Sequence, residues 1–361
     1  MTNHMQAKST PRNQTADALR GAAAVLVIVG HLFARDASLM QTENRFYYLI
    51  SCIHVGIFFF FAGYFAKSGL KKGLARFVGQ KAIRLLVPYV MWSSAAIAAK
   101  ALLAFLQGAW NAQKTIHELL HSLIYGDSAW FFLSLFLMHL FFWCIYNGYW
   151  AYKWTGVLIL AALYLLPMPE EFMLHKTQTM MPFFAIGMLA AYKKEWLQSF
   201  FNKHRLMIRI FALAICLAAP LFMDIAFAYG MSYGILLILS NLLSMLAACA
   251  VCLLIHWLFD KVPVLNKAFV WIGVYSMEVY CIHMIFVSYL PITLPTAVLN
   301  MPEIVPNVIY LLLACLMALI IAALSQFILN RIPIYRWFML GQWPKSFKNK
   351  KGENYDGNLE K

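Results

Sequence analysis

The sequence predicts an all-α, polytopic integral membrane protein with about ten transmembrane helices and both termini in the cytoplasm. Of its 361 residues, 62% are hydrophobic and only 12% are charged, whereas a soluble domain is about 45–50% apolar and about 25% charged. A soluble fold of this length has no interior large enough to bury so many apolar side chains. The apolar residues also form long runs, and basic residues collect in alternate connections between those runs.

The apolar runs define the expected helices, because about 20 residues are needed to cross a hydrocarbon core of about 30 Å. The ten expected ranges are 18–34, 47–66, 83–106, 129–147, 154–167, 180–192, 206–228, 233–258, 270–291 and 304–330. The fifth and sixth runs are short and bracketed by prolines, a pattern that permits an interrupted or partly re-entrant segment. We therefore expect one membrane domain over residues 17–331, with a disordered cytoplasmic N-terminus (1–16) and a basic cytoplasmic tail (332–361).

The distribution of Lys and Arg sets the expected orientation. With the N-terminus in the cytoplasm, 24 of the 29 Lys and Arg residues lie in cytoplasmic segments and four in outer loops. Basic residues gather on the cytoplasmic side of membrane proteins, so both termini are expected inside and the helix count is expected to be even. The same bias accounts for the net charge of +14, and no nucleic-acid partner is expected.

Cysteine spacing gives no sign of a metal site or of a disulfide framework. All seven cysteines lie in apolar stretches, and Cys249 and Cys252 form a single C-x-x-C pair. No second pair and no His-x-x-x-His follows it, so small packing residues are the expected role.

Ionisable side chains inside the expected spans are the candidates for function, because such groups are costly in a bilayer. These residues are Arg20, His31, His54, Lys100, His139, Asp224, His256, Glu278 and His283. Arg20 and His31 lie eleven residues apart on the first helix, which gives about 16 Å along the axis and about 20° around it. This spacing predicts a cation at the cytoplasmic end of the helix. It also predicts a proton-handling imidazole on the same face of the helix, beyond the middle of the membrane. Arg20 also fits an ordinary flanking charge, and His31 fits a hydrogen-bonded packing residue.

Five segments in register carry a family resemblance. They are Asp17–Gly21 followed by Gly30–His31, His54–Tyr64, Lys81–Tyr89, Trp130–Leu133 and Gly273–His283. Taken in this order, they resemble five motifs of the membrane-bound acyltransferase 3 family. The first is that family's Arg-x10-His first helix, the next three are the motifs of its second, third and fourth helices, and the last is its late Gly-x-x-Ser…Tyr-Leu-x-His helix. The aromatic run after His54 is similar to its sugar O-acetylase branch. Lys81 stands where Arg is usual, and a lysine lacks the bidentate fork of arginine.

The resemblance implies an O-acyltransferase of the bacterial cytoplasmic (inner) membrane, with cytoplasmic acetyl-CoA as donor. It implies a hydroxyl of a cell-surface or lipid-linked glycan as acceptor, with His31 as base or acyl relay and Arg20 as the second catalytic residue. Arginine suits the phosphates of coenzyme A. The expected donor ligands are Arg20, Arg84, Lys81 and Arg76. For Arg76 and Lys81, the alternative is a basic residue that only sets the orientation of the protein in the membrane.

The expected acceptor ligands are His54, Glu278, His283 and Trp130. Packing is the alternative for the two histidines, and an interface anchor is the alternative for Trp130. Asp17 is expected either to orient Arg20 or to cap the first helix. Membrane lipid surrounds the expected protein, and an oligomer is compatible with the sequence.

Two other classes of protein fit part of the pattern. A proton-coupled transporter or flippase would use the buried polar groups as a proton relay, and it would show paired repeats and broken helices. The sequence shows no internal repeat, and no break is expected beyond the proline-rich region near Pro167. In a sensory or scaffold protein, the same charges would be structural.

Overall fold

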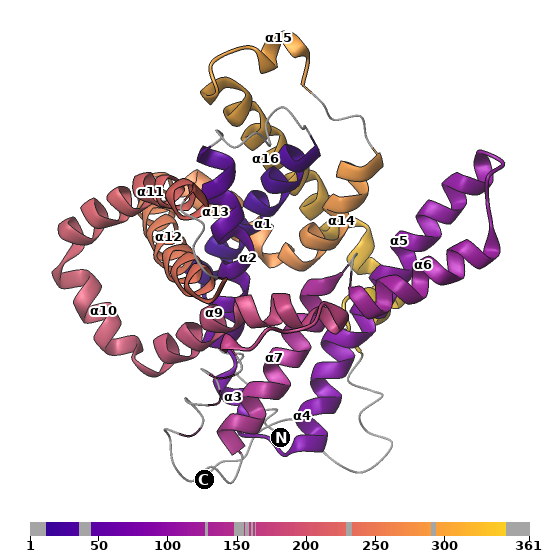
Figure 1. Cartoon of the computed structure of the whole chain (residues 1–361), viewed down its shortest axis with the longest axis horizontal. Coiled ribbons are helices and arrows are strands. Elements are labelled where there is room, and N and C mark those ends of the chain that lie inside the picture. Colours follow the sequence, from indigo (N-terminus) through magenta and orange to yellow (C-terminus); the bar gives the residue numbers. More distant parts are fainter. Residues whose placement is uncertain are drawn as a thin grey trace, which may run out of the picture.

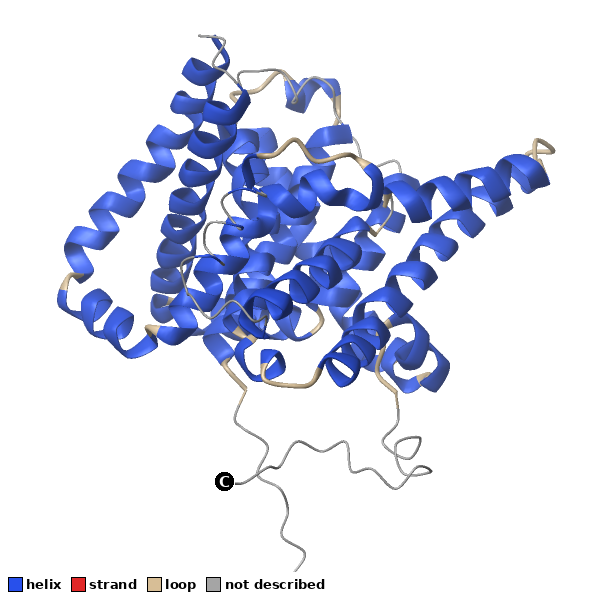
Figure 2. Ribbon diagram, turned by 60° about the horizontal axis from the view of Figure 1, so that its bottom comes forward, coloured by secondary structure: helices blue, strands red, loops and turns tan. Residues whose placement is uncertain are grey.

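The structure is a computed structural model that describes residues 12–35, 45–126, 129–147, 155, 159, 162, 164–228, 233–289 and 294–343. Within these residues every regular element is a helix, as Figures 1 and 2 show. The predicted all-α class is therefore confirmed for the described part of the chain.

The helices follow the apolar runs closely. The first half contains α1 (Gln14–Arg35), α2 (Arg45–Tyr64), α3 (Lys67–Leu70), α4 (Leu74–Lys81), the π-helical turn η1 (Ala82–Leu86), α5 (Val87–Leu106), α6 (Ala112–Tyr125) and α7 (Trp130–Asn147). The second half contains the 3-10 turn η2 (Glu171–Met173), α9 (Leu174–Tyr192), α10 (Lys194–Lys203), α11 (Arg205–Ala228), α12 (Tyr233–Lys261), α13 (Pro263–Val274), α14 (Ser276–Tyr289), α15 (Thr296–Leu299), α16 (Ile304–Phe327), the 3-10 turn η3 (Leu329–Arg331) and the π-helical turn η4 (Tyr335–Met339). The expected span 154–167 lies mostly outside the described residues.

Several helices are long and apolar enough to cross a membrane. Among the described residues these are Gln14–Ala34, Leu74–Leu106, Ala112–Asn147, Ile238–Lys261 and Ile304–Arg331. The bent pair α13–α14 makes a sixth if it is counted as one span. These helices support a multi-pass membrane protein, while the count of ten and the cytoplasmic termini stay predictions.

Helix α1 lies at the centre of the helical body and packs against α2, α13, α14 and α16 (Figure 1). Its side chains Ile28, Leu32 and Phe33 are fully buried. Because lipid is as apolar as these side chains, close packing rather than the hydrophobic effect holds such helices together. Among the polar residues of α1, Asp17 is fully buried, and Arg20 and His31 are partly buried.

Glycines allow two pairs of helices to approach closely. At the α1–α13 crossing, a Cβ atom on Gly21 would overlap the backbone of α13, and one on Gly273 would overlap the carbonyl oxygen of Asp17. At the α2–α9 crossing, Gly63 and Gly187 would meet the backbone of the opposite helix in the same way. Small residues at such contacts are typical of membrane helix pairs.

The expected continuous helix over 270–291 was wrong, and so was the expectation of no broken helix beyond the proline-rich region. Helices α13 and α14 are bent by 82° at Tyr275. The backbone N–H of Tyr275 bonds to the carbonyl of Ile272 rather than continuing the α-helical pattern. The break follows directly on Gly273, and a glycine weakens a helix by about 1 kcal/mol relative to alanine.

The segment between the third and fourth expected spans is largely helical. It contains α6, which runs back along α5 so that the two form a projecting hairpin (Figures 1 and 2). The side chain of Asn111 caps α6 by accepting a hydrogen bond from the N–H of Lys114 at 2.9 Å. Gly126, with φ 70°, ends the helix in the left-handed conformation that favours glycine. An amphipathic helix of 14 residues is too short to appear as a span.

Residues 329–343, here called the C-terminal strap, fold back onto the helical body. The indole N–H of Trp92 on α5 donates to the carbonyl of Met339 at 3.0 Å. Gly341 has φ 61° and lies directly against the backbone of η1 beside Arg84. The strap therefore joins α5 and η1 to the end of α16.

Candidate active site

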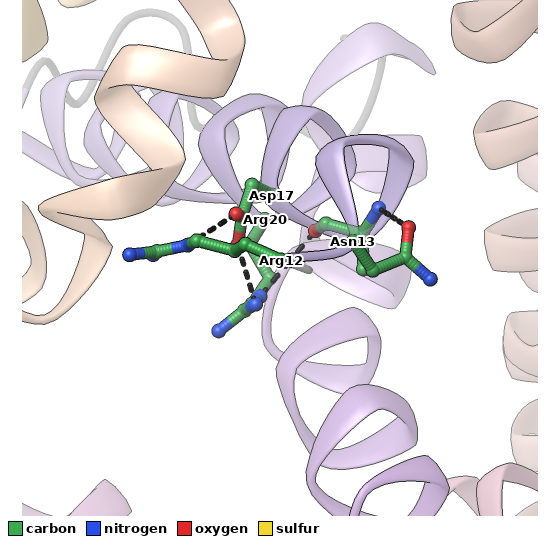
Figure 3. Close-up of polar contacts among 5 residues, drawn as sticks. Arg12, Asn13, Asp17 and Arg20 are labelled. Carbon is green, nitrogen blue, oxygen red and sulfur yellow. Dashed lines mark hydrogen bonds and ion pairs between the residues drawn. The ribbon is translucent and has the colours of Figure 1, made fainter. Parts of the chain in front are cut away.

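A buried carboxylate organises the start of α1. Asp17 is fully buried and lies between two arginines, as Figure 3 shows. Arg20 Nη2 donates to Asp17 Oδ1 at 2.5 Å, and Arg12 Nε pairs with Oδ2. The cap of the helix is Asn13, whose Oδ1 accepts the N–H of Ala16 at 3.1 Å. Asp17 therefore orients Arg20, the first of its two expected roles.

Arg20 is fixed at the end of α1 by further contacts. Its Nε donates to the carbonyl of Ala16 at 3.3 Å. Its guanidinium lies 5.6 Å from the ring centroid of Phe65, just beyond the end of α2. Two guanidiniums around the single carboxylate of Asp17 leave a net positive charge, which attracts anions more strongly in a poorly solvated place.

Three histidines converge from three different helices. The rings of His31 on α1 and His283 on α14 lie 5.2 Å apart between centroids, tilted by 42°. His54 on α2 is close enough to interact electrostatically with both. His31 itself is only partly buried, whereas His283 is 1% exposed. The fold thus joins residues that the sequence offered as separate candidates.

The hydrogen bonds of the two flanking histidines fix their tautomers. His283 Nδ1 lies 3.0 Å from the carbonyl oxygen of Val279, and His54 Nδ1 lies 2.6 Å from that of Ile50. A carbonyl oxygen can only accept, so each Nδ1 carries a proton and each neutral ring keeps Nε2 as an acceptor. Within the described residues, His283 Nε2 is buried and has no hydrogen-bond partner. Buried polar atoms normally have a partner, so this atom marks a place for a donor such as a hydroxyl.

Helix α14 connects the histidines to the positive end of α1. Glu278 is buried, and its Oε1 accepts a hydrogen bond from Asn330 Nδ2 at 3.2 Å. Glu278 also lies close enough to Arg12 to interact with it electrostatically. His283 follows five residues later, which is about 7.5 Å along a helix. The two polar regions are therefore neighbours along one helix.

Aromatic side chains from α7 pack on Tyr280 of α14, which in turn lies next to His283. The ring of Tyr280 lies 5.0 Å from that of Phe131 and 6.0 Å from that of His283. The adjacent Trp130 has Lys176 Nζ 5.0 Å from its centroid and packs against Phe59 at 6.2 Å. These contacts compete with a sugar for the face of the Trp130 ring.

The remaining expected donor ligands lie around the π-helical turn η1. Arg84 is exposed on this turn, and Lys81, which precedes it, lies 5.7 Å from the ring centroid of Phe77. The turn has a local cause, because Pro88 has no N–H to bond to the carbonyl four residues earlier. Arg76 is on α4, one turn before Lys81. The four expected donor ligands thus belong to two basic groups. Arg20 lies near the start of α1, and the other three lie around η1.

Two residues of the C-terminal strap lie next to the site although sequence reasoning did not select them. Asn330 bonds to Glu278, and Tyr335 lies near enough to Glu278 to interact with it electrostatically. Both follow the last apolar run, where no periodicity or motif singles them out. A contact of this kind becomes visible only when the chain is folded.

Two other kinds of site are less well supported by the described residues. Among the described residues, no group of three or more His, Cys, Asp or Glu side chains could hold a metal ion. A cavity of about 350 Å³ between α7 and α9 is lined mainly by apolar side chains, including Met138, Cys144 and Met181. It contains none of the candidate residues, so the polar groups along α1 and α14 are the better candidate site.

Comparison with known proteins gives one match. The family model described as an acyltransferase domain matches residues 13–326, which is most of the chain. The matched range begins with the Asp17 cluster and reaches almost to the end of α16. Neither the curated proteins nor the solved structures contain a match to this chain.

Proposed function

Because this chain belongs to the acyltransferase 3 family, we propose that it is a membrane O-acetyltransferase that uses cytoplasmic acetyl-CoA. Family membership supports acyl transfer by a membrane protein. The identities of the acyl donor and of the acceptor are what we propose here. The acceptor would be a hydroxyl of a cell-surface or lipid-linked glycan at a bacterial cytoplasmic membrane. The observation that carries the proposal is the position of His31 on the central helix, next to the ring of His283, whose Nε2 has no hydrogen-bond partner among the described residues.

His31 acts in this scheme as the general base. Its imidazole takes the proton of the acceptor hydroxyl, and the oxygen attacks the carbonyl carbon of the thioester. A carbon–oxygen bond forms, the carbon–sulfur bond breaks, and the coenzyme A thiolate takes the proton from the imidazolium. A base of this kind contributes about 10²–10⁴-fold to the rate. An acyl-histidine relay would accomplish the same exchange in two steps at the same residue.

The neighbouring histidines suit the handling of an acceptor hydroxyl. The Nε2 atom of His283 can accept a hydrogen bond from the hydroxyl or from the ring N–H of His31, since His283 Nδ1 is already used. His54, whose Nδ1 is likewise used, can hold a second hydroxyl of the sugar through its Nε2. Trp130 is the weaker candidate, because Lys176 and Phe59 already occupy its ring.

Arg20 is proposed to attract the phosphates of the donor to the inner end of α1. The two guanidiniums around Asp17 provide the positive charge, and arginine matches phosphate oxygens with paired donors. Arg84, Lys81 and Arg76 extend this charge around η1. Arg84 is the most accessible of the three because it is exposed on its turn.

A transporter or flippase remains the second candidate, and one observation favours it. The 82° bend between α13 and α14 resembles the discontinuous helices that form binding sites in transporters. The two functions differ in their chemistry, because only an acyltransferase leaves an ester on the acceptor. Transport of a glycan without acyl-CoA and without a covalent product would support the transporter.

The proposal is tested by acyl transfer in proteoliposomes. Purified protein receives radiolabelled acetyl-CoA and a membrane glycan extract, and ester-linked label is counted. We expect label with the wild type and none with His31→Gln. The control His256→Gln, which changes a histidine of α12 outside the candidate site, should be labelled like the wild type. Size-exclusion chromatography checks that each variant is folded. Full labelling by His31→Gln would remove His31 from catalysis, and no labelling by the wild type would contradict the proposed activity.

A further inference from the structure

A polar cluster next to the histidines is not used by the reaction described above. It consists of Glu278 on α14, Asn330 on η3 and Tyr335 on η4, and is here called the Glu278 cluster. The Nδ2 group of Asn330 donates to Glu278 Oε1 at 3.2 Å. Tyr335 interacts electrostatically with the same carboxyl group and packs at 6.4 Å, edge to face, on Trp92. Three elements far apart in the sequence thus build one polar site.

Two atoms of this cluster lack a hydrogen-bond partner. In the described part of the chain, Asn330 Oδ1 and Tyr335 Oη are both buried and unpartnered. Leaving such atoms unsatisfied is costly, and each normally has a protein, water or ligand partner. Glu278 determines which atom of the Asn330 amide is available, because it uses the NH₂ group and leaves the oxygen. The site therefore presents one acceptor together with one hydroxyl that can donate.

A secondary amide is the ligand group that complements this pair. Its N–H can donate to Asn330 Oδ1, and its carbonyl oxygen can accept from the Tyr335 hydroxyl. An ionised phosphate ester accepts but does not donate, so it would satisfy only Tyr335, whereas a hydroxyl could satisfy both atoms. Glu278 was expected to contact the acceptor sugar, and the position of the cluster, rather than its chemistry alone, favours the acyl donor instead.

The position of the cluster agrees with that ligand. Glu278 lies within electrostatic reach of Arg12, which pairs with Asp17 at the proposed phosphate end. His283 lies five residues farther along α14, beside His31. An acyl-CoA has the same order of groups, with phosphates, then a pantetheine arm that contains secondary amides, then the thioester.

We propose that the Glu278 cluster binds an amide of the pantetheine arm of the acyl donor. The proposal rests on the proposed function, since it assumes that acyl-CoA is the donor. Tyr335 donates to the amide carbonyl, Asn330 accepts from the amide N–H, and Glu278 orients Asn330. The C-terminal strap thereby supplies two ligands for the donor and also packs on the turn that carries Arg84.

The test compares two probes on single-atom variants. Binding of coenzyme A and of its adenosine bisphosphate fragment, which lacks the arm, is measured by calorimetry in detergent. Tyr335→Phe should weaken coenzyme A binding about fivefold to thirtyfold and leave the fragment unchanged. Tyr192→Phe, which removes an exposed hydroxyl, should alter neither, whereas Arg20→Gln should weaken both.

Three results would overturn the inference. Unchanged affinity of Tyr335→Phe for coenzyme A would exclude the contact, and equal loss for both probes would place Tyr335 at the phosphates. If the wild type binds neither probe, the proposed donor is wrong and this inference falls with it. Should Tyr335→Phe fail to fold, an ester analogue of the arm is tested on the wild type. Lacking the N–H, it should bind about fivefold to thirtyfold more weakly than coenzyme A, and equal binding would refute the proposal.

Discussion

Replacing Asp17 by asparagine should loosen the N-terminal end of α1 and displace Arg20. The substitution keeps the size of the side chain but removes the charge between two arginines. Asp17 is 0% exposed, whereas the side chains of Arg20 and Arg12 are 29% and 55% exposed. Without the carboxylate, the two guanidiniums lie close together with no negative charge between them.

The size of the effect follows from the two contacts. A hydrogen bond to a charged group contributes about 1.5–3 kcal/mol, and this range applies to the pair with Arg20. The pair with Arg12 is more than half exposed on one side, so solvent screening reduces it to about 0.2–1 kcal/mol. Together they predict a loss of about 2–4 kcal/mol in unfolding free energy.

Thermal unfolding in detergent measures this loss, and Glu118→Gln is the matched control. Glu118 forms an exposed pair with Lys114 at 4.0 Å, which should contribute only about 0.3–0.5 kcal/mol. The midpoint should therefore fall clearly for Asp17→Asn and hardly at all for Glu118→Gln. Equal midpoints for the two variants would refute the view that the buried carboxylate holds α1 and Arg20 in place.

Two glycine substitutions test the packing around the site. Gly273→Ala should destabilise the protein by about 1–3 kcal/mol, because its Cβ would overlap the Asp17 carbonyl. Gly79→Ala, where a Cβ meets nothing within 4 Å, should be neutral or stabilising in thermal unfolding, and equal stability of the two would contradict the close crossing. Gly341→Ala should cost more than the roughly 1–2 kcal/mol of left-handed strain alone, since its Cβ also meets η1. Gly108→Ala isolates the strain, because Gly108 has φ 70° but open space around it, and equal losses would show that the strap does not press on η1.

Local features of the fold were predictable from the sequence. Long apolar runs predicted the positions of α1, α7, α12 and α16 within a few residues, because an apolar run of about 20 residues that crosses a membrane satisfies its backbone by forming a helix. The pairing of Asp17 with Arg20 was also foreseeable, since residues three apart lie on one face of a helix.

Features that depend on distant contacts were not predictable. The break at Tyr275 follows the contact of Gly273 with α1, which has no sequence signature. His31 and His283 were both candidates, but only the packing of α14 on α1 brings their rings together. Asn330 and Tyr335 lie beyond the last apolar run and become part of a site only because the strap folds back.

The role of His31 is tested most directly by chemical rescue. The variant His31→Gly leaves space where the imidazole was, and added imidazole can occupy it. Acetyl transfer from acetyl-CoA is then measured as a function of imidazole concentration in proteoliposomes. We expect the variant alone to be inactive and added imidazole to restore transfer. A variant that transfers acetyl groups at the wild-type rate without imidazole would show that this side chain takes no part in the chemistry.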